Sequence, residues 1–275
     1  MTAARSTQPF DYPAAGERVG VRCAASVPLS KLTTIGVGGP ASWVFYPQTM
    51  SAAAKIYAEL HVGPLPVRLL GAGSNVIVVD EGVRAAVICT RELRSEPRRL
   101  PGDRIRVGAG HPLPGLARWA ASEGLSGLEF AEGIPGQVGG GLRMNAGAHG
   151  RWMSDVTEQV FVAEPGGAVG ARDVDAGDFG YRESFLSREG SFAVGAVLRL
   201  TPDDPERITG RMKGFRDRRR ASQPIRERSA GCVFANPSEE PAGALIDRLG
   251  LKEASVGGAV VSGKHGNFIV NRTGA

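Results

Sequence analysis

The sequence has 275 residues, 42% hydrophobic and 22% charged, and 33 Lys and Arg against 28 Asp and Glu give a formal net charge of +5. This composition is typical of a globular protein that is long enough for one large or several small cores. The mild positive balance suits an anionic small ligand. We expect no nucleic-acid partner, because no basic stripe with interleaved aromatic residues occurs.

The rarer residue types exclude further classes. Three cysteines and four histidines are widely scattered, so we expect neither a disulfide framework nor a metal site. The first twenty residues lack the apolar core of a signal peptide, and no apolar run approaches the roughly 18 residues of a membrane span. We therefore expect a cytoplasmic protein without a membrane span.

The first third of the chain predicts a small βαββ-like unit after an irregular arm. Residues 1–28 show little periodicity and form the predicted arm. The expected elements of the unit follow in the order strand 41–47, helix 48–62, strand–glycine turn–strand 66–80 and strand 84–91.

The remaining chain predicts a second strand-rich unit and a last, smaller domain. Within residues 113–125 the apolar spacing indicates a helix, and residues 156–174 alternate like a hairpin with Gly-Gly at its turn. The other expected elements are strand 103–110, a glycine-rich loop with a short helix near 133–147, strand 191–202, helix 207–224, helix 242–251 and strands near 259–262 and 267–271.

Two glycine-rich segments are the first candidate ligand sites. "GAGSN" (71–75) follows an apolar strand, and its consecutive amides favour either a nest for phosphate or a plain tight turn. It does not open a helix as the dinucleotide-binding fingerprint does. The second segment is "GIPGQVGGGLRMNAG" (133–147), in which many glycines leave the main chain without side chains to cover it. A flat or extended ligand that lies along the main chain explains this composition better than a packed turn does.

Three further motifs carry polar chemistry. In "YRESF" (181–185) the arginine either stacks on Tyr181 or holds a carboxylate with its planar guanidinium. "RDRRRASQP" (216–224) is mainly a solvated helix face, although one or two of its arginines could meet a diphosphate. In "SAGCVFANP" (229–237) the cysteine is either a small packed hydrophobe or a proton donor.

Taken together, these segments resemble one family. "TTIGVGGPA", "LLGAGSNVIVVDEG", "GIPGQVGGGLRMNAGAHG", "YRESF", "RRRASQP", "SAGCVFANP" and "KHGNFIVN" occur in the same order as in the UDP-N-acetylenolpyruvoylglucosamine reductases of bacterial cell-wall synthesis. The resemblance extends from about Leu29 to the last residue, and the chain is similar to the shorter of two family types.

The resemblance implies an α+β protein with an FAD-binding domain of the p-cresol methylhydroxylase (vanillyl-alcohol oxidase) type. On this basis we expect the arm at residues 1–28, the FAD-binding domain at 29–204 and the substrate domain at 205–275. The FAD-binding domain would divide into subdomains at about 29–92 and 93–204. FAD would be bound non-covalently, and NADPH would be the reductant.

The resemblance also assigns site residues. Arg182 would be the active-site arginine and Cys232 the catalytic proton donor. The substrate, a UDP-sugar enolpyruvyl ether, would contact Arg182, Gln223, Cys232 and Asn236. The residues expected to contact FAD are Gly71, Ala72, Gly73, Ser74, Asn75, Gly133, Ile134, Pro135, Gly136, Val138, Gly139, Gly140, Asn145 and Gly147.

Two departures from the family pattern leave alternatives open. Position 235 is Ala, where relatives often have a Lys that contacts phosphate. A catalytic Glu is expected in a segment after "NFIVN", and the printed sequence ends at Ala275, before that segment. The reductase is therefore one hypothesis. The others are a different FAD-dependent hydroxy-acid oxidoreductase and a non-catalytic protein that binds FAD and a nucleotide sugar. No protein partner is implied.

Overall fold

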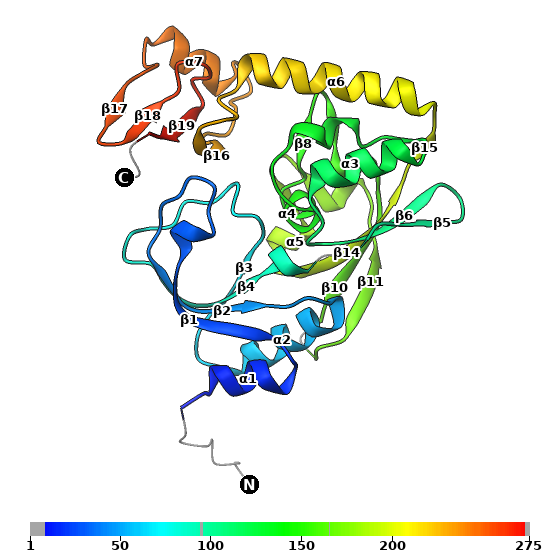
Figure 1. Ribbon diagram of the computed structural model, residues 1–275, viewed down its shortest axis with the longest axis vertical. Coiled ribbons are helices and arrows are strands. Elements are labelled where there is room, and N and C mark those ends of the chain that lie inside the picture. The colour runs from blue at the N-terminus through cyan, green and yellow to red at the C-terminus, as the bar shows by residue number, and fades with distance from the viewer. Residues whose placement is uncertain (1–8, 94–95, 165, 273–275) are drawn as a thin grey trace.

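The computed structural model of the protein describes residues 9–93, 96–164 and 166–272. Two sheets with their helices are followed by a long helix, which leads to a third sheet at the other end of the molecule (Figure 1). Within the described residues, no helix is both long and apolar enough to cross a membrane. Helices are combined with sheets whose strand pairs are mostly antiparallel, and the parallel pairs are those of β4 with β2 and β3, so the architecture is α+β, as expected.

The first sheet has the strand order β1-β2-β4-β3, with β1 antiparallel and the other neighbours parallel. Its elements are α1 (Tyr12–Arg18), β1 (Arg22–Pro28), η1 (Leu29–Lys31), β2 (Pro40–Tyr46), α2 (Met50–Val62), β3 (Val67–Leu70), β4 (Val83–Cys89) and η2 (Thr90–Glu92). Helix α2 begins after Thr49, whose hydroxyl accepts a hydrogen bond from the Ala52 amide (3.1 Å). The predicted βαββ-like unit is confirmed by β2, α2, β3 and β4.

Two expectations for this region are wrong. Residues 1–28 are not an irregular arm where the structure describes them, because they contain α1 and β1, and β1 pairs with β2 along its whole length. Residues 76–79 form no strand: turn-type hydrogen bonds hold them instead, since the Val79 carbonyl accepts from the amides of Gly39 and Gly82.

The second sheet is antiparallel throughout, in the order β11-β10-β14-β6-β5. Its strands are β5 (Arg98–Leu100), β6 (Arg104–Gly108), β10 (Thr157–Ala163), β11 (Val169–Asp173) and β14 (Phe192–Arg199). Strands β10 and β11 confirm the predicted hairpin. The smaller elements around the sheet are α3 (Leu113–Ser122), β7 (Leu125–Ser126), η3 (Glu129–Gly133), α4 (Val138–Arg143), β8 (Gly147–Ala148), β9 (Arg151–Trp152), η4 (Met153–Asp155), η5 (Ala176–Asp178), β12 (Phe179–Gly180), β13 (Glu183–Ser184), α5 (Phe185–Arg188) and β15 (Thr201–Pro202).

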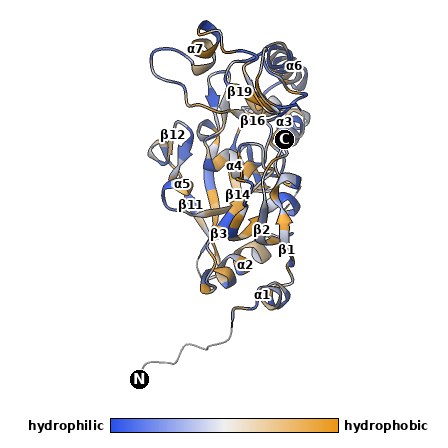
Figure 2. Cartoon of the chain, turned by 90° about the vertical axis from the view of Figure 1, so that its left-hand side faces the viewer, coloured by the Kyte–Doolittle hydropathy of each residue, from blue (hydrophilic) through white to orange (hydrophobic). Residues whose placement is uncertain are grey.

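Strand β14 joins two hydrophobic cores. Phe192 and Val194 belong to the core around α2, whereas Ala196 and Leu198 belong to the core under α3 and α4. Every residue of β14 except the last is buried, which explains its nearly continuous hydrophobic run (Figure 2). The two cores are therefore joined through one shared strand.

Helix α6 (Pro205–Ser222) spans the distance from the second sheet to the last domain (Figure 1). Only Ile208 and Met212 of this helix are buried, and ion pairs Arg211–Glu129 (2.7 Å) and Arg216–Glu132 (3.0 Å) fix it to η3. The predicted helix at 207–224 is confirmed.

The last domain is a four-stranded antiparallel sheet in the order β16-β19-β18-β17. Its elements are β16 (Arg228–Cys232), α7 (Ala242–Arg248), β17 (Ser255–Val256), β18 (Ala259–Val261) and β19 (Phe268–Asn271). The predicted strands near 259–262 and 267–271 are confirmed, whereas β16, which carries Cys232, was not predicted.

Candidate active site

The turn at residues 71–75 is built around Gly73, which has a φ of +71°. A Cβ on Gly73 would lie 1.9 Å from the Leu32 carbonyl oxygen, so no other residue fits there. Among the described residues, none accepts a hydrogen bond from the amides of residues 72–75. A row of unpaired amides next to a left-handed glycine is suited to binding an anionic group such as phosphate.

The second glycine segment lies directly against this turn. The Ser74 hydroxyl donates to the Pro135 carbonyl (2.9 Å). The next residue, Gly136, has a φ of +135°, and a Cβ on it would lie 3.2 Å from the same hydroxyl. The buried Gln137 side chain fixes the segment by donating to the Gly110 carbonyl (2.7 Å). At Gly140 a Cβ would meet nothing within 4 Å, so the main chain there is open to a ligand. The structure thus brings together residues 71–75 and 133–140, the two segments that are expected to contact FAD.

Arg182 lies in the two-residue turn between β12 and β13 and has a φ of +59°. Few non-glycine residues adopt this conformation, and such strain is common at functional sites. Its guanidinium donates to the Cys232 carbonyl (3.3 Å) and lies 5.7 Å from the ring centre of Tyr181. The contact with Tyr181 agrees with the stacking interpretation of "YRESF", the carboxylate-binding role stays a prediction, and Arg182 is next to Cys232.

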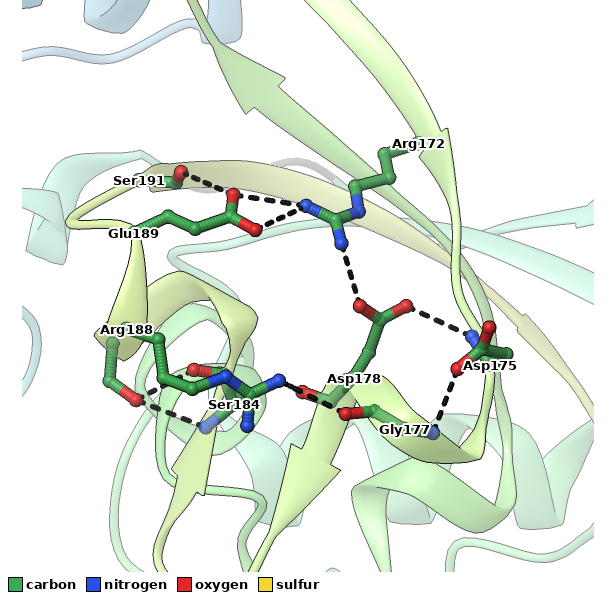
Figure 3. Close-up of polar contacts among 9 residues, drawn as sticks. Arg172, Asp175, Gly177, Asp178, Ser184, Arg188, Glu189 and Ser191 are labelled. Carbon is green, nitrogen blue, oxygen red and sulfur yellow. Dashed lines mark hydrogen bonds and ion pairs between the residues drawn. The ribbon is translucent and has the colours of Figure 1, made fainter.

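A network of charged side chains braces the base of this turn (Figure 3). Arg172 contacts Asp178 (2.7 Å) and Glu189 (2.9 Å), while Arg188 donates to the carbonyls of Gly177 and Asp178. Ser184, just after the turn, donates to the Arg143 carbonyl (3.0 Å) at the end of α4. The hairpin is thereby fixed on both sides, which supports the strained turn at Arg182.

Cys232 is at the end of β16, immediately after an irregular step in the strand. The pairing with β19 shifts register between Ser229 and Cys232, and Gly231 has a φ of +78°. A Cβ on Gly231 would lie 4.0 Å from the Ser74 carbonyl, so this strand end approaches the first glycine turn. The thiol is free and half-buried.

The protonation of Cys232 reflects two opposing effects. Burial raises the pKa of the thiol above its ordinary value, and the nearby guanidinium groups of Arg182 and Arg219 oppose this rise. Burial is the larger effect, so the thiol remains protonated at neutral pH. A protonated thiol beside two cations can donate a proton, and the cations stabilise the thiolate that remains.

Arg219 was not singled out by sequence reasoning, although it belongs to the basic segment 216–224. Its side chain packs on Gly133, where a Cβ would lie 2.6 Å from the Arg219 Cδ. The Nε of Arg219 and the Oε1 of Gln223 are buried and have no hydrogen-bond partner among the described residues. The two residues are four apart, and Gln223 is the C-cap residue at which α6 ends. That spacing from Gln223 was the signal that could have identified Arg219.

Four predicted site residues have other contacts. The Asn145 side chain is buried, donates to the Gly180 carbonyl (3.2 Å) and accepts from the Ser154 amide (3.0 Å), so it supports the Arg182 hairpin. The Val138 side chain is fully buried in the core. Gly147 packs against the Trp152 ring, and the Asn236 side-chain oxygen accepts from the Ala242 amide (3.2 Å).

The comparison with protein families defines the class. A family described as "FAD binding domain" matches residues 41–169, which contain both glycine segments. The chain is therefore an FAD-binding flavoprotein. A second family, "UDP-N-acetylenolpyruvoylglucosamine reductase, C-terminal domain", matches residues 223–275.

The relatives identify the family. The UDP-N-acetylenolpyruvoylglucosamine reductase of Synechococcus sp. (strain JA-3-3Ab) is 44% identical over 256 residues, which are 92% of this chain and 81% of that protein. The enzyme of the same name from Bacillus subtilis is 38% identical over 94% of this chain and 86% of its own length. This chain belongs to the UDP-N-acetylenolpyruvoylglucosamine reductase family.

Solved structures agree with this assignment. The reductase of the same family from Thermus caldophilus superposes with a TM-score of 0.79 and 41% identity, over 91% of this chain and 88% of that one. A variant of berberine bridge enzyme superposes with a TM-score of 0.55 over 71% of this chain and 44% of that one. At 14% identity the latter shows only that the fold is shared. The expected fold class is thereby confirmed.

Proposed function

We propose that this protein uses NADPH and FAD to reduce UDP-N-acetylglucosamine enolpyruvate to UDP-N-acetylmuramate, a step in the synthesis of peptidoglycan precursors. The observation that carries the proposal is the convergence of four separate segments. Ser74 contacts Pro135, Gly231 approaches Ser74, and Arg182 contacts Cys232. The site thus combines a place for a flavin nucleotide with an arginine and a proton donor.

The residues present fit FAD. The unpaired amides of residues 72–75 suit its diphosphate, and the open main chain at Gly140 leaves room for a ligand at close approach. When bound, FAD supplies the hydride that it has received from NADPH. Asn145 and Val138 act by shaping and supporting the site, because their side chains are committed to other contacts, and Gly147 does so by letting the Trp152 ring pack on its main chain.

Arg182 and Cys232 have distinct roles in this proposal. Hydride addition at the vinyl terminus of the substrate spreads negative charge onto the adjacent carboxylate, where a fixed guanidinium stabilises the transition state. Arg182 is held in place for this by its braced hairpin. The neighbouring carbon then receives a proton from the Cys232 thiol, and the resulting thiolate lies between Arg182 and Arg219.

The substrate would extend along the end of α6 and the start of the last domain. Gln223 offers a buried side-chain oxygen that no other described residue pairs with, and Asn236 is placed by the Tyr181 hydroxyl, which accepts from the main-chain amide of Asn236 (3.1 Å). In this proposal the FAD-binding domain ends at residue 204 and the substrate domain begins at residue 205. The cytoplasmic location and the absence of a protein partner stay predictions.

Anaerobic stopped-flow measurements of the two half-reactions test this proposal. NADPH should reduce the bound flavin, and UDP-N-acetylglucosamine enolpyruvate should then reoxidise it, with UDP-N-acetylmuramate as the product identified by mass spectrometry. Glycolate and lactate serve as controls for a hydroxy-acid oxidoreductase. Flavin reduction by a hydroxy acid, together with no reoxidation by the nucleotide sugar, would exclude the proposed reaction. Failure to bind FAD at all would exclude both enzymes.

A further inference from the structure

The loop at residues 33–39, between η1 and β2, bridges the first sheet and the last domain. It rises from the first sheet toward β16 and β19, next to the loop that follows β3 (Figure 1). The Thr34 hydroxyl donates to the Ser229 carbonyl (2.7 Å), and the Asn271 side chain donates to the Ile35 carbonyl (3.0 Å). The Arg228 guanidinium lies against Gly36. Three consecutive residues of one loop thus contact the last domain.

Thr34 also contacts the first glycine turn. Its amide donates to the Gly73 carbonyl (2.9 Å), and its hydroxyl lies 3.3 Å from the same carbonyl oxygen. A hydroxyl carries a single proton, and the shorter distance assigns that proton to Ser229. Thr34 therefore joins the turn that binds phosphate to the strand that carries Cys232, through its amide on one side and its hydroxyl on the other.

The position of Ser229 makes this hydrogen bond consequential. Strand β16 is at the edge of its sheet, so its outer side has no neighbouring strand in that sheet. Ser229 is the last residue paired before the register shift that leads to Cys232. The Thr34 hydroxyl binds the Ser229 carbonyl, and this hydrogen bond to a residue of an edge strand fixes the position from which β16 turns toward the glycine loops.

We propose that Thr34 is a positioning residue that sets the place of Cys232 relative to the bound flavin. The inference rests on the proposed role of Cys232 as proton donor. Thr34 does not touch the reacting atoms in this account. It acts through the Ser229 carbonyl, and removing its hydroxyl should disturb proton transfer to the substrate while flavin reduction by NADPH continues.

The test compares Thr34→Val with two matched variants of the FAD-loaded protein, residues 1–275. Valine keeps the shape of threonine and removes the hydroxyl, while Thr34→Ser keeps the hydroxyl and should behave like wild type. Thr33→Val is the control, because the Thr33 hydroxyl donates within the same loop, to the Val37 carbonyl (2.9 Å). If Thr34→Val does not fold, Thr34→Ala carries the same expectation.

Two readouts decide the outcome. The first is the rate at which iodoacetamide alkylates Cys232, followed by peptide mass spectrometry with Cys23 as internal reference. Thr34→Val should raise this rate about fivefold, the ratio expected for one lost hydrogen bond. The second is stopped-flow of both half-reactions, in which only substrate reduction should slow, by about 5–10-fold.

Equal alkylation rates in Thr34→Val and Thr33→Val would overturn the inference. So would faster alkylation with unchanged substrate reduction, because the contact would then exist without a role in positioning the donor. The alkylation assay needs no substrate. If wild type itself fails to reduce the nucleotide sugar, the proposed function fails, and an unchanged alkylation rate in Thr34→Val would still count separately against the positioning contact.

Discussion

Replacing Arg219 with methionine should make the protein more stable and a poorer enzyme. The Arg219 side chain is half-buried, and among the described residues its buried Nε has no hydrogen-bond partner and its charge has no ion pair with an acidic residue. Burial lowers the pKa of this guanidinium below its ordinary value. The charged form is therefore disfavoured in the folded protein, and the charge on Arg219 lowers the free energy of unfolding at every pH below that pKa, neutral pH included. Such an arginine is explained if an anionic ligand pairs with it.

The expected size follows from these contacts. An unsatisfied buried polar group costs about 1–3 kcal/mol, and methionine retains most of the aliphatic stem that packs on Gly133. Arg219→Met should therefore raise the free energy of unfolding by about 1–2 kcal/mol, or the Tm by roughly 2–6 °C. A lost hydrogen bond to a charged group should weaken substrate binding by about 10–150-fold.

The assay is thermal unfolding of the FAD-free protein by circular dichroism, combined with the KM for the nucleotide sugar. Arg220→Met is the control, because Arg220 is the exposed neighbour and Lys264 contacts only its carbonyl. That variant should change stability by less than about 0.5 kcal/mol. A lower Tm for Arg219→Met with an unchanged KM would refute the reasoning and identify Arg219 as an ordinary structural residue.

The remaining predictions concern the two proposed catalytic residues and use stopped-flow of both half-reactions. Cys232→Ala should slow substrate reduction by about 10²–10⁴-fold without affecting flavin reduction, and Cys232→Ser should be milder; normal turnover by the alanine variant would show that the thiol only packs. Because burial raises the pKa of Cys232, substrate reduction should be level through neutral pH and fall as the pH rises through that pKa, and Cys232→Ser should lack this alkaline fall. Arg182→Lys should be nearly as damaging as Arg182→Ala, since lysine has no planar fork for a carboxylate; activity equal to wild type would leave Arg182 as a stacking residue.

Sequence-based prediction worked best for the elements whose core-facing apolar residues recur at the spacing of a helix or a strand. Helix α2, strand β14 and the β10–β11 hairpin are examples, because their apolar residues repeat as packing requires. Residues 76–79 have an equally apolar run, yet they lack a strand neighbour, and Val78 packs under Gly38 instead. Local pattern does not encode whether a partner strand is present, so this segment was misassigned.

The site was predictable to the extent that it is made of unusual residues. Glycine clusters and a rare thiol stand out in a sequence, and the structure brings them together. Thr34 and Arg219 are ordinary residues whose importance comes from what lies opposite them: a carbonyl almost two hundred positions away and a bare glycine. Strand β16 was missed for a related reason, since its short run of serine, alanine and glycine has no strand signature of its own.

The contacts that α6 makes along its length require a fixed number of residues between them. The ion pair of Arg211 with Glu129 anchors the first half of the helix, and Arg219 lies eight residues later, about 12 Å along the axis. One inserted residue between them would turn Arg219 by about 100° around the helix and move it away from Gly133. Length variation is therefore tolerable in an exposed turn such as the one between β5 and β6. Within α6 a whole extra turn would restore the direction of Arg219 but move it about 5.4 Å along the axis and away from Gly133, so insertions of either kind should be excluded between these two arginines.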